Sequence, residues 1–81
     1  MKVPRQWSGG DLTKALGVLG YEVTRQTGSH IRLTTQMRGE HHLTVPGHKV
    51  LPLGTFRAIL RDVARHFECT PEEILSRLFG S

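Results

Sequence analysis

Histidines next to glycine, serine and lysine are the side chains of this chain best suited to chemistry. The 81 residues include five histidines, and histidine is the side chain that exchanges a proton near neutral pH. His30 follows Gly28 and Ser29, and His48 precedes Lys49. Cleavage of RNA needs a base for the 2′-hydroxyl, an acid for the leaving oxygen and cations for the phosphate charge. His30 is therefore a candidate general acid or base, and the alternative is a surface histidine that only binds phosphate or caps a turn.

Other catalytic and metal-binding patterns are missing from the sequence. It contains no glycine-rich phosphate loop, no H-E-x-x-H and no G-x-S-x-G. His41 and His42 are adjacent, so in a strand they point to opposite faces and cannot share one ion without distortion. The only cysteine, Cys69, cannot form an intramolecular disulfide. We expect no metal and no cofactor.

The charge balance favours a nucleic-acid partner. Eleven lysines and arginines, eight of them arginine, stand against seven acidic residues and give a formal net charge of +4. Arginine binds phosphate through two parallel hydrogen bonds and stacks on bases, so this composition favours nucleic acid over a membrane surface. The alternative is a basic but unspecialised surface. The apolar runs are too short for a membrane-spanning helix, and no secretory signal follows Met1, so a cytoplasmic location is expected.

Hydrophobic periodicity predicts a helix and a three-stranded meander in the first half of the chain. A helix is expected over 9–19, capped by Ser8 and ended by Gly20, after an N-terminal arm over 1–7 whose Trp7 packs back on the domain. Strands are expected over 21–27, 29–35 and 40–45. One face of the sheet should be covered by helices, and it carries Tyr21, Val23, Ile31, Leu33, Leu43 and Val45.

Two further helices are predicted after a loop over 46–54. Thr55 is the expected cap of a core-facing helix over 56–67, and the T-P-E-E sequence from Thr70 predicts a capping box and a final helix over 70–80. The arginines at 57, 61 and 65 form an i, i+4, i+8 ridge. The predicted fold is α+β, a single domain over 1–81 of order α-β-β-β-α-α. This is the plan of double-stranded-RNA-binding domains, with a three-stranded antiparallel sheet backed by helices on one face.

Strand register decides which histidines can act together. If Leu33 faces Leu43, then His30 lies opposite Pro46, and the loop with His48 and Lys49 starts beside it. His42 then falls opposite Thr34, several residues away. A group made of His30, His48 and Lys49 is expected, and a pair made of His30 and His42 is not.

Three motifs in this order resemble the HicA toxin family. They are G-S-H at 28–30, V-P-G-H at 45–48 and L-G-T-F-R-A-I-L-R at 53–61, and the similarity runs from about Ser8 to about Ala64. The resemblance implies a double-stranded-RNA-binding-domain-like fold and a metal-independent mRNA interferase of a toxin–antitoxin system. It also implies a HicB-like antitoxin as partner. The catalytic histidine that it implies is the one in G-S-H, which is His30 here.

The sequence departs from the family in two places. Many members carry a second histidine where this chain has Ile31, which by alternation points into the core, so its loss should not abolish cleavage. The segment from about His66 to Ser81 extends beyond the usual ending, and it could pack on the domain, form a dimer or meet the antitoxin. Packing on the domain is the favoured interpretation, in a monomer or weak homodimer.

Auxiliary roles are assigned to the basic and polar residues around His30. Ser29, Arg32, His48 and Lys49 are expected to help bind phosphate. The ridge of Arg57, Arg61 and Arg65 could follow an RNA groove or meet an acidic antitoxin surface. Two rival functions remain open: an RNA-binding module without catalysis, and a protein-interaction domain whose basic surface meets an acidic partner.

Overall fold

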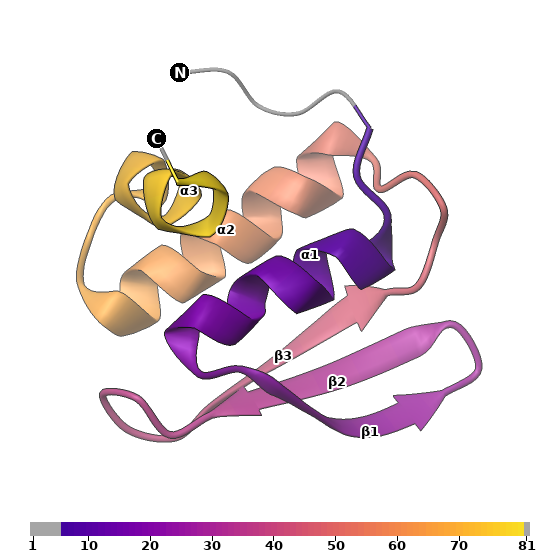
Figure 1. Ribbon diagram of the computed structural model, residues 1–81, viewed down its shortest axis with the longest axis horizontal. Coiled ribbons are helices and arrows are strands. Elements are labelled where there is room, and N and C mark those ends of the chain that lie inside the picture. The colour runs from indigo at the N-terminus through magenta and orange to yellow at the C-terminus, as the bar shows by residue number, and fades with distance from the viewer. Residues whose placement is uncertain (1–5, 81) are drawn as a thin grey trace.

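A three-stranded antiparallel sheet carries helices on one side and is uncovered on the other (Figure 1). The computed structural model describes residues 6–80, so residues 1–5 of the predicted arm lie outside the described residues. The α+β class and the predicted order α-β-β-β-α-α are confirmed. The elements are α1 (Gly9–Leu16), the short 3₁₀ turn η1 (Gly17–Leu19), β1 (Glu22–Thr27), β2 (His30–Thr35), β3 (His41–Pro46), α2 (Leu53–Phe67) and α3 (Pro71–Phe79).

Ser8 caps the first helix, as predicted, and the structure shows that this cap is a full capping box. The Ser8 hydroxyl accepts from the backbone N–H of Asp11, and the Asp11 carboxylate accepts from the backbone N–H of Ser8. These two bonds satisfy backbone donors that the first turn leaves free. The last predicted turn winds as a 3₁₀ turn instead of α-helix, and it ends at Gly20 with a left-handed φ of 81°.

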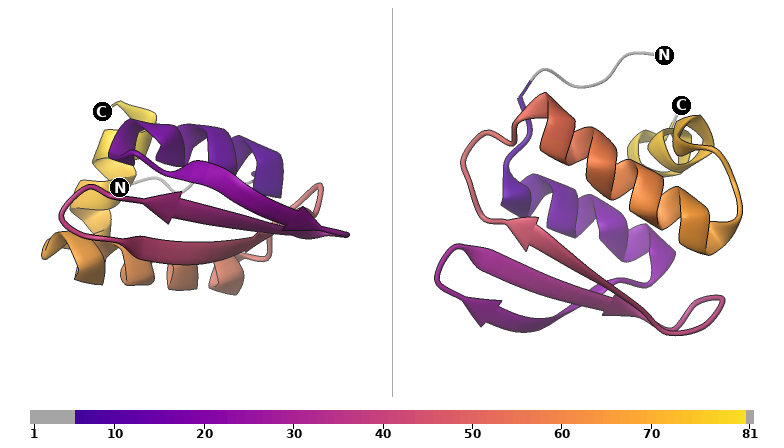
Figure 2. Two further views of the ribbon diagram at one scale, coloured as in Figure 1. Left: turned by 90° about the horizontal axis from the view of Figure 1, so that it is seen from below. Right: turned by 180° about the vertical axis from the view of Figure 1, so that it is seen from behind.

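The register of β2 against β3 agrees with the prediction at every position named. Leu33 faces Leu43, His30 faces Pro46 and Thr34 faces His42. Residues that alternate with the buried Leu33, beginning with His30 and Arg32, therefore point away from the helices. Seen from below, the strands lie in front of the helices, on the side that no helix covers (Figure 2).

One hydrophobic core fills the space between the sheet and the helices. Its buried members up to the end of β3 are Leu12, Leu16, Leu19, Tyr21, Ile31, Leu33, Leu43 and Val45, and those after β3 are Leu51, Phe56, Ile59, Leu60, Val63, Ala64, Phe67, Ile74, Leu75 and Leu78. Val23 was predicted to join them and is 52% exposed instead. It faces Leu33 across β1 and β2. β1 is one of the two edge strands, and every one of its residues is exposed, so the helices do not extend over it.

The second helix begins earlier than predicted. It starts at Leu53 after Pro52, and Thr55 lies inside its first turn, so the prediction of Thr55 as the cap was wrong. Proline suits this place because its φ is already close to that of a helix start. The Thr70 hydroxyl does cap α3 by accepting from the backbone N–H of Glu73.

The last helix packs on the domain through its apolar face. α3 contacts α2 and α1, and Ile74 is fully buried. The ring of Phe79 lies 4.2 Å from that of Trp7, centroid to centroid, so Trp7 packs back as predicted. Within the described residues, no helix is long and apolar enough to cross a membrane.

Candidate catalytic site

The hairpin between β1 and β2 presents His30 at the start of β2, on the uncovered side of the sheet. Gly28 and Ser29 form a two-residue turn, and Gly28 has a φ of 56°. A type II′ turn requires positive φ at its first central position, and glycine adopts it at little cost. His30 is exposed, faces Thr27 on one neighbouring strand and faces Pro46 on the other.

Three backbone hydrogen bonds fix the loop that carries His48 and Lys49, one of them to this turn and two to the chain around the start of α1. The N–H of Gly47 donates to the carbonyl of Ser29, and the N–H of Gly9 donates to the carbonyl of His48 at 2.9 Å. The N–H of Leu51 donates to the carbonyl of residue 7 at 2.7 Å. The loop therefore joins the G-S-H turn to the first turn of α1.

Close backbone contact requires glycine at one point of this junction. A Cβ on Gly9 would lie 1.9 Å from the carbonyl oxygen of Pro46 and 2.9 Å from the Cα of Gly47. A Cβ on Gly47 would lie 3.1 Å from the carbonyl oxygen of Ser29. Helix α1 and the loop meet backbone to backbone at Gly9, with no room for a side chain.

The structure brings together the predicted site residues near the G-S-H turn. Ser29, His30 and Arg32 follow one another along the turn and β2, and the loop with His48 and Lys49 is bonded to the carbonyl of Ser29. All five side chains are exposed. Within residues 6–80, none of them makes a side-chain hydrogen bond or an ion pair. They are free to meet a ligand from solvent.

The other three histidines are engaged in the structure. His42 contacts the hydroxyl of Thr34 at 2.8 Å and the carboxylate of Glu40 at 2.7 Å. On the opposite face, as predicted, His41 contacts the hydroxyl of Tyr21 at 2.7 Å and the carboxylate of Asp62 at 3.3 Å.

The third engaged histidine stacks on His41. The two rings of His41 and His66 lie 4.5 Å apart with an interplanar angle of 11°. The Nε2 of His66 also lies 2.9 Å from the carbonyl oxygen of Met37. These histidines hold the sheet, the turn after β2 and α2 together.

Two observations on the described residues concern metal ligands and the single thiol. No three histidine, cysteine or acidic side chains among residues 6–80 are arranged to hold a metal ion. Burial raises the pKa of the Cys69 thiol, and the nearby Glu73 carboxylate raises it further. A raised pKa lowers the thiolate fraction, which is the reactive form.

The arginine ridge lies in a different layer from His30. Arg57, Arg61 and Arg65 are exposed on α2 and have no ion-pair partner within the described chain. α2 belongs to the helical layer, whereas His30 points away from the helices. The structure therefore does not bring the ridge and His30 onto one face.

Sequence reasoning missed Arg25. A β-bulge between Val23 and Arg25 shifts the register of β1, and Arg25 faces Arg32 as a result. Unbroken alternation from Val23, which faces the buried Leu33, would have placed Arg25 on the side of the helices. No residue in β1 marks the bulge in advance.

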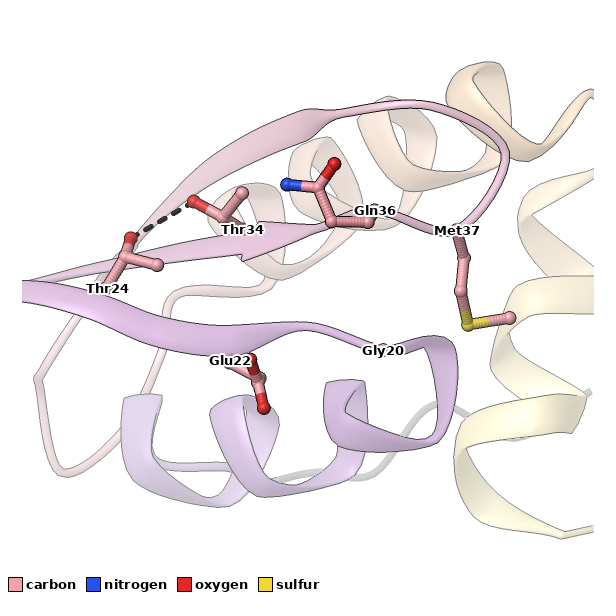
Figure 3. A pocket seen from close by; sticks show the side chains of 6 residues that line it. All are labelled: Gly20, Glu22, Thr24, Thr34, Gln36 and Met37. Carbon is pink, nitrogen blue, oxygen red and sulfur yellow. Dashed lines mark hydrogen bonds between the residues drawn. The ribbon is translucent and has the colours of Figure 1, made fainter.

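A shallow hollow of about 460 Å³ lies at the other end of the same sheet (Figure 3). Glu22 is the only charged residue that lines it, together with Gly20, Thr24, Thr34, Gln36 and Met37. The hydroxyls of Thr24 and Thr34 are 3.0 Å apart and bond to each other. None of the predicted site residues lines this hollow.

Comparison with known proteins gives one result. A family model described as the HicA toxin of bacterial toxin–antitoxin systems matches residues 9–64, which span α1, the sheet and most of α2. No curated protein and no solved structure matches the chain.

Proposed function

The chain belongs to the HicA toxin family of bacterial toxin–antitoxin systems, and we propose that it is an mRNA endoribonuclease that uses His30 and no metal ion. We further propose that a HicB-like antitoxin neutralises it. The family match covers residues 9–64, and α3, which packs on α1 and α2, belongs in this proposal to the same domain.

One observation supports this function above the others. His30 is the exposed histidine of the G-S-H turn, and it lacks a partner within residues 6–80, whereas His41, His42 and His66 have partners. An imidazole on the surface of a rigid strand can accept or donate a proton without first breaking an internal bond.

The surrounding residues supply the rest of the proposed chemistry. His30 takes the proton of the 2′-hydroxyl as that oxygen bonds to phosphorus and the bond to the 5′-oxygen breaks. The leaving oxygen needs a proton, and His48, in the loop bonded to the G-S-H turn, is the auxiliary donor. Ser29, Arg32 and Lys49 bind the phosphate and stabilise the charge that develops on it.

The antitoxin is proposed to bind the basic surface. The ridge of Arg57, Arg61 and Arg65 is exposed and without ion-pair partners in the described chain. It can meet an acidic protein surface or contact RNA phosphates. Because the ridge and His30 lie in different layers, an inhibitor would block RNA from His30 and Arg32 by covering the uncovered side of the sheet, and the ridge would serve as a separate contact for it.

The decisive experiment compares two histidines that share one face of the sheet. Native protein, His30→Ala and His42→Ala are incubated with a long unstructured RNA in EDTA, after circular dichroism has shown that each is folded. We expect cleavage by the native protein and by His42→Ala, and a rate at least about 100-fold lower for His30→Ala, the lower range for loss of a general acid or base.

Each other outcome rejects part of the proposal. Cleavage that stops in EDTA would exclude a metal-free mechanism. Equal rates for His30→Ala and native protein would remove His30 from the chemistry. RNA that is shifted on a gel but left intact by folded native protein would favour the alternative, a non-catalytic RNA-binding module.

A further inference from the structure

We propose that Arg25 and Arg32 form a phosphate clamp beside His30, so that single-stranded RNA crosses the uncovered side of the sheet. This inference rests on the proposed ribonuclease function and adds the path of the substrate. Arg25 is the new element, because neither its place in β1 nor the three motifs mark it as a site residue.

The β-bulge turns Arg25 toward this side of the sheet. Val23 faces Leu33, and continued pairing would set Arg25 against Ile31, which is buried on the side of the helices. Insertion of one residue at the bulge sets Arg25 against Arg32 instead. Bulges commonly redirect a side chain next to a functional site.

Thr24, the inserted residue, is held on the uncovered side of the sheet. Its hydroxyl donates to the carbonyl of Arg32 at 3.4 Å and bonds to the hydroxyl of Thr34 at 3.0 Å. Thr34 faces His42, on the same side as His30. The bulge is therefore tied to β2 by side-chain bonds, which fixes the direction in which the next residue, Arg25, leaves the strand.

Two arginines directly opposite each other repel unless an anion lies between them. Side chains paired across antiparallel strands have Cβ atoms about 5 Å apart, and like charges in this arrangement destabilise a sheet. Both guanidinium groups are exposed and, within residues 6–80, neither has an ion-pair partner. A phosphodiester can accept bidentate hydrogen bonds from arginine and cancel the repulsion.

The charges on this side of the sheet are unevenly distributed along the strands. Arg25, Arg32 and His30 lie toward the G-S-H turn, whereas Glu22 and Glu40 lie toward the opposite end. Glu40 is bonded there to His42 at 2.7 Å. A polyanion is therefore attracted to the end that carries His30 and repelled from the end that carries the hollow.

The spacing of the basic groups suits an extended strand of RNA. His30 and Arg32 are two residues apart on β2, about 6.6 Å along the strand, and Arg25 is the diagonal neighbour of His30, about 7–8 Å away. These distances allow one phosphate to lie at His30 while the next lies between the two arginines. The clamp would hold the strand in place next to the bond that is cleaved.

The test measures binding separately from cleavage. A fluorescent 2′-O-methyl oligoribonucleotide lacks the reactive hydroxyl, so it reports affinity alone. Its dissociation constant is measured at several salt concentrations for native protein, Arg25→Gln, Arg32→Gln and the control Arg77→Gln, which removes an exposed arginine from α3. Cleavage of the matching unmodified RNA is measured with the same proteins.

The clamp predicts the same change for Arg25→Gln as for Arg32→Gln. We expect each to weaken binding about 5- to 30-fold, because each removes one charge-assisted contact to phosphate. The slope of log affinity against log salt should flatten by about 0.7 for each lost phosphate contact with a single strand. Arg77→Gln should change both quantities by less than Arg25→Gln does.

The like charges give a second readout that needs no RNA. At low salt, Arg25→Gln should melt at the same temperature as native protein or higher, and inorganic phosphate should raise the melting temperature of native protein more than that of Arg25→Gln. A melting temperature that phosphate raises equally in both proteins would contradict an anion site between the arginines.

The outcomes separate the clamp from the ribonuclease proposal. Arg25→Gln with native affinity and native salt slope overturns the clamp even if RNA is cleaved normally. If Arg25→Gln and Arg32→Gln weaken binding as expected but the native protein does not cleave RNA, the clamp stands and the ribonuclease proposal is rejected. If the native protein binds no oligonucleotide and its basic side binds only an acidic protein, the clamp is overturned as an RNA site.

Discussion

Substitution of Gly9 by alanine tests whether the contact between α1 and the 46–51 loop holds the site together. The carbonyl oxygen of Pro46 would lie 1.9 Å from the added methyl carbon. It would have to recede by about 1.5 Å to reach 3.4 Å, the shortest ordinary contact. Because the obstacle is backbone, no side-chain rotation can relieve it.

The expected loss of folding stability in Gly9→Ala has two contributions and one partial compensation. Overpacking of a tight contact costs about 1–3 kcal/mol, and displacement of the loop weakens the hydrogen bond from Gly9 to the carbonyl of His48, worth about 1 kcal/mol. Alanine gains up to about 1 kcal/mol over glycine in a helix. The free energy of unfolding should fall by about 1–3 kcal/mol, out of roughly 4–12 kcal/mol for a chain of this length.

Urea unfolding followed by the fluorescence of Trp7, the only tryptophan, measures this loss. Gly17→Ala is the matched control, because Gly17 has a helical φ of −57° and a Cβ there meets nothing within 4 Å. It should leave stability unchanged or raise it by up to about 1 kcal/mol. RNA cleavage per folded molecule should fall in Gly9→Ala and not in Gly17→Ala. Equal stability and equal cleavage in the two variants would refute this account of the junction.

Two further predictions concern the packing around the site. Burial, and to a smaller extent the Asp62 carboxylate, raises the pKa of Tyr21 in the folded protein. The neutral phenol therefore stabilises the fold at pH values below about 10, the pKa of tyrosine in the unfolded chain. This stabilisation is lost as the pH rises from there toward the pKa of the folded state. Urea titrations between about pH 8 and 11 should show a decline for native protein that is smaller for Tyr21→Phe, and parallel declines would contradict the assignment. Phe79→Ala removes a ring whose centroid lies 4.2 Å from that of Trp7 and 6.3 Å from that of Phe56. It should lower the free energy of unfolding by about 2–4 kcal/mol, and Phe79→Leu should recover much of this loss. A Phe79→Ala protein as stable as the native one would show that α3 adds little to the core.

Alternation alone was enough to predict the pairing of β2 with β3. The apolar residues of both strands recur at every second position and bury one side, so a slip by one residue would expose Leu33 and Leu43 together. The free energy of that exposure is large compared with any other register preference. For this reason the position of His30 opposite Pro46 followed from the sequence.

The errors fall where no burial constrains the chain. β1 is exposed along its whole length, so nothing in its pattern distinguishes regular pairing from a bulge, and the same lack of cover explains why Val23 is exposed. The start of α2 was placed three residues late because Thr55 offered a capping hydroxyl, whereas Pro52 and the loop geometry begin the helix at Leu53. Local preference at a helix start is worth about 1 kcal/mol, which tertiary contacts easily exceed.

The candidate site was only partly accessible to sequence reasoning. The register placed the loop of His48 and Lys49 next to His30, and the structure adds the backbone bonds that hold it there. Those bonds depend on Gly9, which contacts Pro46 across 37 positions of the sequence. No periodicity connects α1 to this loop, so a glycine at the start of a helix carried no sign of its role.

The engaged histidines provide the strongest internal comparison for His30. His41 and His66 stack and bond to neighbouring elements, and His42 bonds to Thr34 and Glu40 on the same side of the sheet as His30. His42 shows that a histidine with structural contacts is bonded here even where it is exposed. His30 has none within the described chain, although the turn before it and the loop beside it are fixed by backbone bonds. A rigid backbone that presents an unpartnered imidazole next to two unpaired arginines is the arrangement expected when the partner is a ligand, because the bonds that the imidazole lacks are those that the ligand supplies.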